Sequence, residues 1–81
     1  MAKEIGRIIE IKATNRALEL FYFPEDKRIV SRVKTKEKHL LKGFKVNDKV
    51  ELIFYNNYNE SDRGLEIKGF DNNWLEHIKH M

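Results

Sequence analysis

The sequence predicts an all-β fold, a single small domain in which one sheet of five strands closes into a barrel. Five stretches alternate apolar and polar residues with the two-residue period of a half-buried strand. Turn-forming Asn, Pro, Asp or Gly residues separate these stretches. The chain has 81 residues, which is enough for one domain. A five-stranded sheet with one apolar side buries that side by curling, and closure also removes most exposed edges.

The first two strands are expected over residues 5–13 and 17–23, because apolar residues alternate along both. Asn15 tolerates a positive φ angle, so Asn15-Arg16 fits a hairpin turn between them. Pro24 ends the second strand, since its ring fixes φ and its nitrogen has no hydrogen to donate.

The middle of the chain predicts a strand, a short helix and another strand. Residues 28–35 resume the alternation, whereas residues 36–42 do not alternate and fit one or two helical turns. Thr35 suits the N-cap of this helix, and Gly43 suits the position just past its end. Residues 49–55 alternate again and form the fourth strand.

The last quarter of the chain predicts a loop, a strand and a terminal helix. Residues 56–64 are rich in Asn, Asp, Ser and Gly and read as a loop, and residues 65–70 form the fifth strand. Apolar residues then recur at helical spacing, which predicts an amphipathic helix over residues 71–81 that covers one end of the barrel. We therefore expect a barrel domain over residues 1–70 and a helical tail after it. The apolar residues of that tail are Trp74, Leu75, Ile78 and Met81.

Five strands with a short helix between the third and the fourth favour an OB-like barrel. An SH3-like barrel is the nearest alternative, because the number of strands does not separate the two. The interior should be filled by the apolar residues of the alternating sides. These are Ile9, Ile11, Leu18, Leu20, Val33, Val50, Leu52, Phe54, Leu65 and Ile67.

One segment resembles a known family. Residues 40–54 (LLKGFKVNDKVELIF) resemble the LLKGxKVGDKVxFxF segment of small periplasmic copper- and silver-binding barrels of the CusF type. Residues 6–11 look like the opening strand of those proteins, and Pro24 lies where their metal loop begins. Asn47 stands where the family usually has Gly, a replacement that a left-handed turn tolerates. The resemblance spans residues 6–55 and implies the barrel fold. A weaker likeness runs to the OB domains of translation factors, which bind RNA.

The metal site of that family does not carry over. The resemblance would imply methionine sulfurs, a histidine and a tryptophan, and soft thioethers are the ligands that select Cu(I). Residues 22–35 hold no Met, His or Trp. Arg28, Arg32 and Lys34 occupy this stretch instead and would repel a cation. We therefore expect no metal and no other cofactor.

Composition excludes several other classes. The chain has no cysteine, hence no disulfide and no thiolate zinc site. No apolar run approaches the roughly 18 residues of a membrane span, and the N-terminal segment lacks the features of a secretion signal. A cytoplasmic protein without membrane contacts is expected. His77 and His80 are three residues apart and read as a surface pair, and since no catalytic motif is present we do not expect an enzyme.

Charge and aromatic side chains on the outward strand positions suggest a binding surface. Residues 27–49 hold nine bases against two acids, an asymmetry that suits an anionic partner. Aromatic rings stack on nucleobases and cations bind phosphates, so we expect a non-catalytic module that binds single-stranded RNA or DNA. The alternatives are a protein partner or self-association, a small-ligand or metal carrier related to the periplasmic metal-binding barrels, or the terminal helix packed over the same face. The residues expected to bind are Phe21, Phe23, Arg28, Arg32, Lys34, Tyr55 and Lys68.

Overall fold

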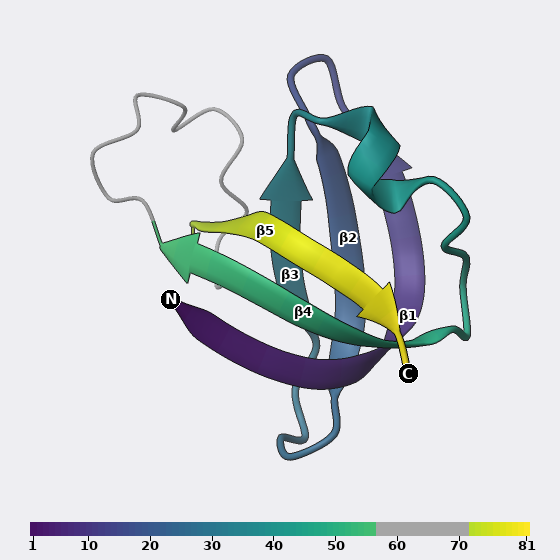
Figure 1. Cartoon of the computed structure of the whole chain (residues 1–81), viewed down its shortest axis with the longest axis vertical. Coiled ribbons are helices and arrows are strands. Elements are labelled where there is room, and N and C mark those ends of the chain that lie inside the picture. Colours follow the sequence, from purple (N-terminus) through teal and green to yellow (C-terminus); the bar gives the residue numbers. More distant parts are fainter. Residues whose placement is uncertain (57–71) are drawn as a thin grey trace.

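The computed structural model describes residues 1–56 and 72–81 and confirms an all-β, five-stranded closed barrel (Figure 1). Around the barrel the strands follow one another in the order β1-β2-β3-β5-β4. This order, with a short helix between β3 and β4, is compatible with an OB-like barrel. No helix within the described ranges is long and apolar enough to cross a membrane. The elements are β1 (Ala2–Ala13), β2 (Leu18–Pro24), β3 (Ser31–Thr35), the 3-10 helix η1 (Lys38–Leu41), β4 (Lys49–Asn56) and β5 (Asn73–His80).

Strand β1 is long enough to pair with two neighbours. Its first half runs antiparallel to β4, from Ala2 opposite Phe54 to Arg7 opposite Lys49. Its second half runs antiparallel to β2, as far as Ala13 opposite Leu18. The barrel closes where β5 lies antiparallel to β4 and parallel to β3. Because one strand serves both pairings, residues at its centre sit beside β2 and β4 at once.

A β-bulge in β1 corrects one predicted core residue. The register against β2 shifts between Ile8 and Glu10, so the inward and outward sides exchange at this point. Ile8 is 1% exposed and lies in the core, whereas Ile9 is 41% exposed. The prediction that Ile9 points inward was therefore wrong, because strict alternation leaves no room for the extra residue of a bulge.

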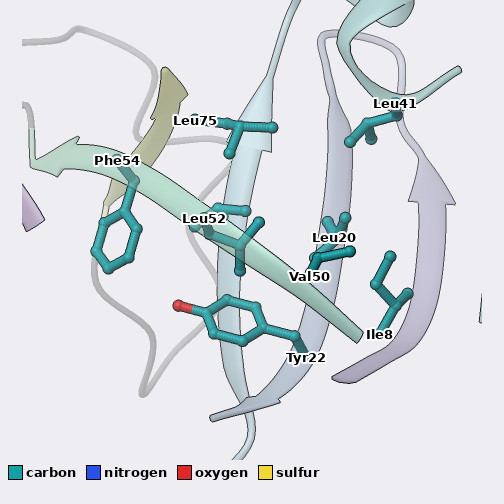
Figure 2. Close-up of a cluster of buried hydrophobic side chains, with 9 residues drawn as sticks. Ile8, Leu20, Tyr22, Leu41, Val50, Leu52, Phe54 and Leu75 are labelled. Carbon is teal, nitrogen blue, oxygen red and sulfur yellow. The ribbon is translucent and has the colours of Figure 1, made fainter. Parts of the chain in front are cut away.

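The core is a cluster of buried aliphatic side chains together with the rings of Tyr22 and Phe54 (Figure 2). The Tyr22 hydroxyl donates a hydrogen bond to Glu4 Oε1 at 2.5 Å. Of the predicted interior, Ile11 and Leu18 are partly buried and pack against this cluster, while Leu65 and Ile67 lie outside the described residues. The core residues are Ile8, Leu20, Tyr22, Val33, Leu41, Val50, Leu52, Phe54 and Leu75, and they include the five remaining predicted ones.

The C-terminal segment is a strand, which contradicts the predicted helix over residues 71–81. β5 pairs with β4 from Asn56 opposite Asn73 to Val50 opposite His80. This pairing covers an edge of β4 that would otherwise be open. The helical spacing of the apolar residues arises because a register shift in the pairing with β4 interrupts the alternation, and Trp74 and Leu75 are buried side by side. The predicted strand over residues 65–70 lies outside the described residues.

The predicted helix between β3 and β4 is confirmed as the short η1. Its N-cap is Glu37 and not the predicted Thr35, whose Oγ1 accepts a hydrogen bond from the Glu37 amide at 3.0 Å. Gly43 follows with a φ of 85°, and Asn47 has a φ of 78°. Both therefore adopt the left-handed conformation that Gly and Asn tolerate. They shape the segment of residues 42–48, here called the connector, which leads from η1 to β4.

Candidate functional site

The outer wall of the barrel carries a row of one ring and two bases across three strands. Arg7 on β1 pairs with Phe23 on β2 and with Lys49 on β4. Side chains of directly paired residues point to the same face of a sheet. Neighbouring strands lie about 4.8 Å apart. The Phe23 ring, 45% exposed, therefore has the Arg7 guanidinium and then the Lys49 ammonium beside it.

A shallow hollow of about 400 Å³ surrounds this row. Among its described lining residues, four bases stand against one acid. Gly6 forms part of its floor and lets β1 approach β2 closely, because a Cβ atom there would lie 2.8 Å from the Phe23 carbonyl oxygen and 2.8 Å from the Tyr22 ring. The lining residues are Gly6, Arg7, Phe23, Pro24, Glu25, Lys27, Arg28 and Lys49.

The four bases of the hollow differ in how firmly they are held. Arg7 Nη1 donates to the Asn47 carbonyl oxygen at 2.7 Å, which fixes the guanidinium and leaves its other N–H groups to donate elsewhere. Lys49 Nζ lies 3.2 Å from Glu25 Oε2. Lys27 Nζ lies 2.8 Å from Glu4 Oε2. Arg28 is exposed and forms no ion pair within the described part of the chain.

Two of the predicted binding residues are buried, which corrects the prediction that they face solvent. Arg32 is 1% exposed and Lys34 is 0% exposed. Arg32 Nη1 lies 3.1 Å from Glu19 Oε2 on β2. Lys34 Nζ lies 4.6 Å from the centroid of the Trp74 ring, a cation–π contact. Alternation along β3 predicts which side these residues occupy, yet it says nothing of the acid and the ring that neighbouring strands supply.

Two other predicted binding residues, Phe21 and Tyr55, do not line the hollow around Phe23. Phe21 is half-buried and pairs with Arg32. Tyr55 is exposed but lines a second hollow of about 340 Å³ together with Trp74. Lys68 lies outside the described residues. The single wall of rings and cations predicted from the sequence is therefore not assembled, and only Phe23 and Arg28 meet in one hollow.

The second hollow offers less to an anion. Glu37 and Glu76 line it beside Lys36. The Lys36 ammonium already lies 5.3 Å from the Trp74 ring centroid. With acids outnumbering bases among its described lining residues, this hollow lacks the positive potential that the first one has.

Sequence reasoning missed three bases of the first hollow, namely Arg7, Lys27 and Lys49. Arg7 alternates in step with Ile9 and Ile11, which were predicted to point into the barrel, so it was not expected on the outer wall. Its proximity to Phe23 follows from the register between two strands, and the identity of paired residues is not visible in either strand alone. The residues of this hollow that the sequence did indicate are Phe23, which precedes Pro24, and Arg28, which follows shortly after.

No family model, curated protein or solved structure matches this chain. The candidate site therefore rests on the geometry of the hollow. Over residues 1–56 and 72–81, no three His, Asp or Glu side chains gather in a way that could hold a metal ion.

Proposed function

We propose that this protein binds single-stranded RNA or DNA in the hollow around Phe23. The observation that carries the proposal is an exposed aromatic ring in a concave site, in which the basic side chains among the described lining residues outnumber the acidic ones four to one. A nucleobase stacked on such a ring contributes about 1–3 kcal/mol to the binding free energy, and cations beside the ring neutralise phosphates. OB-like barrels commonly bind oligonucleotides over β2 and β3, and Phe23 lies on β2.

The residues of the hollow take different parts in this proposal. Phe23 stacks on one base, while Arg7 and Arg28 contact the phosphates on either side of it. Arg7 is held in place by Asn47, so the remaining donors of its planar guanidinium are preorganised for the oxygens of a phosphate. A base reaches the ring with its flat face only when it is unstacked, which favours a single strand over a duplex.

The proposal is tested by the fluorescence anisotropy of a labelled oligothymidylate of about 12 nucleotides, titrated at about 0.05 and 0.2 M salt. Replacing Phe23→Ala should weaken binding about 5- to 140-fold, the loss of one stacking contact. Tyr55→Ala is the matched control, because this ring is exposed but lies in the other hollow, and its affinity should match the unmodified protein. An oligonucleotide that does not bind at the lower salt concentration refutes the proposal.

A protein partner or self-association is the second candidate, favoured by two neighbouring apolar residues. Ile29 and Val30 in the β2–β3 connection are exposed, close in the chain to Phe23. Exposed apolar side chains that cluster mark protein interfaces. This reading predicts an assembly visible by light scattering that persists at high salt and is disrupted by Ile29→Ser, whereas binding to an oligonucleotide weakens steeply with salt.

The likeness to CusF-type barrels is kept as a proposal about the scaffold alone. Residues 40–54, which carry it, form the end of η1, the connector and most of β4. We propose that the chain shares this architecture without the metal-carrying activity. Titration with Cu(I) tests the point, and stoichiometric binding would overturn it.

A further inference from the structure

The connector of residues 42–48 is fixed against the outer edge of the hollow. The Asn47 amide donates to the Ile8 carbonyl oxygen at 2.8 Å, and the Ile8 amide donates to the Asp48 carbonyl oxygen at 2.9 Å. Arg7 adds its hydrogen bond to the Asn47 carbonyl oxygen. In Figure 1 the connector descends from η1 to the start of β4. Its last residues are thus held beside the centre of β1, where the row of Phe23, Arg7 and Lys49 crosses the sheet.

A second set of contacts holds the connector against the end of β5. The ring of Phe44 stacks on that of His80, with centroids 4.2 Å apart. Asp48 Oδ2 lies 3.1 Å from His80 Nε2 and accepts a hydrogen bond from the Lys45 amide at 3.0 Å. The segment between η1 and β4 is therefore anchored to both β1 and β5.

The connector adds exposed bases to this edge. Lys42 and Lys45 are exposed and form no ion pair among the residues that the structure describes. Asp48, the acid of the connector, is already engaged by His80 and by the Lys45 amide. Lys49 follows directly and belongs to the hollow. Lys45 and Lys42 thus extend the positive charge of the hollow along the connector, where they can track a polyanion.

We infer that a single strand with one base on Phe23 continues across Arg7 and Lys49 onto the connector, where Lys45 and Lys42 contact its phosphates. This inference rests on the proposed function and adds the path of the strand. The path runs across the strands from β2 to β4, in the direction set by the register of Phe23, Arg7 and Lys49. It predicts that affinity grows with the length of the oligonucleotide beyond the few nucleotides that the hollow can hold.

The experiment measures binding of labelled oligothymidylates of about 3, 6 and 12 nucleotides, within and below the site sizes of OB folds. The variant Lys42→Gln/Lys45→Gln removes two connector cations. The matched control is Lys12→Gln/Arg16→Gln, which removes two exposed bases from the β1–β2 hairpin region. Thermal unfolding of both variants should coincide with that of the unmodified protein, since all four side chains are exposed.

The salt dependence of the affinity measures how many phosphates the connector lysines contact. Each phosphate neutralised on a single strand contributes about 0.7 to the slope of log affinity against log salt. For the longest oligonucleotide, the connector variant should lose about 1.4 from this slope, while the control keeps it. For the shortest, the unmodified protein and both variants should bind alike, because so short a strand ends before the connector.

Two outcomes overturn the inference and are distinguishable. Equal slopes for the connector variant and the control, with Phe23→Ala still weakening binding, would show that the strand leaves the hollow by another route and would leave the proposed function intact. Loss of any dependence on Phe23, or no binding by the unmodified protein, would remove the proposed function and this path together.

Discussion

Replacing Arg32→Met should destabilise the protein strongly, because it breaks a buried ion pair. Arg32 and Glu19 side chains are 0% and 3% exposed, with Nη1 and Oε2 3.1 Å apart. Removing one partner of such a pair costs about 3–5 kcal/mol, mostly from the charge left behind. Lys34 pairs with Glu19 in the register of β2 and β3 and keeps one cation beside it. We therefore expect the lower end, about 3 kcal/mol, out of the roughly 4–12 kcal/mol available to a chain of this size.

The assay is urea unfolding followed by the fluorescence of Trp74, the single tryptophan of the chain, which is 5% exposed and becomes solvated on unfolding. A loss of about 3 kcal/mol corresponds to a fall in the urea midpoint of roughly 1–3 M. Arg28→Met is the matched control, since Arg28 is exposed and should change stability by no more than about 0.5 kcal/mol. A cost below about 1 kcal/mol for Arg32→Met, or equal costs for both variants, would refute the reasoning.

Three further predictions concern stability. Tyr22→Phe should cost about 1.5–3 kcal/mol by the same unfolding assay, because the Glu4 carboxylate loses its hydrogen-bond donor. Gly6→Ala should cost about 1–3 kcal/mol, since the new Cβ atom would meet the Phe23 carbonyl oxygen on β2 at 2.8 Å. The Lys45 amide, followed by His80, holds the pKa of Asp48 below its ordinary value of 3.8. This contribution to stability is present above the ordinary pKa and is lost as the pH falls through the lowered one, so Asp48→Asn should flatten the acid side of the stability profile.

The fold was predictable to the extent that it depends on local alternation and turn chemistry. The strands before the connector and β4 were placed within a few residues, because the two-residue alternation of apolar and polar residues holds over most of their length. Asn47 was correctly expected to tolerate a left-handed turn. The C-terminal strand was not predictable, because the register shift between the pairs of Leu75 and His77 lets Leu75 and Ile78, three residues apart, pack against the same core and imitates the spacing of a helix. A bulge had the same effect at Ile9.

The candidate site was predictable only in part, because it depends on contacts between strands. Phe23 was found from its outward position, and Arg28 from the cluster of bases. Arg7 could not be found, since its place beside the Phe23 ring follows from the pairing of β1 with β2. The burial of Arg32 depends likewise on Glu19 from the neighbouring strand. A single sequence indicates which side of a strand a residue occupies and leaves open what the adjacent strand places against it.

The exposure of the outward side of β2 supports a proposed binding surface that lies toward β1 rather than β3. Exposure along this side rises from 3% at Glu19, through the half-buried Phe21, to 45% at Phe23. At the covered end of β2, Glu19 forms an ion pair with Arg32 of β3. A ligand that approaches this wall therefore meets the Phe23 end first. There the neighbouring strand is β1, so the available cations are Arg7 and, one strand further, Lys49. Because the pair with Glu19 buries Arg32 on the β3 side of β2, the cations that remain accessible beside Phe23 are those on the β1 side, next to the connector.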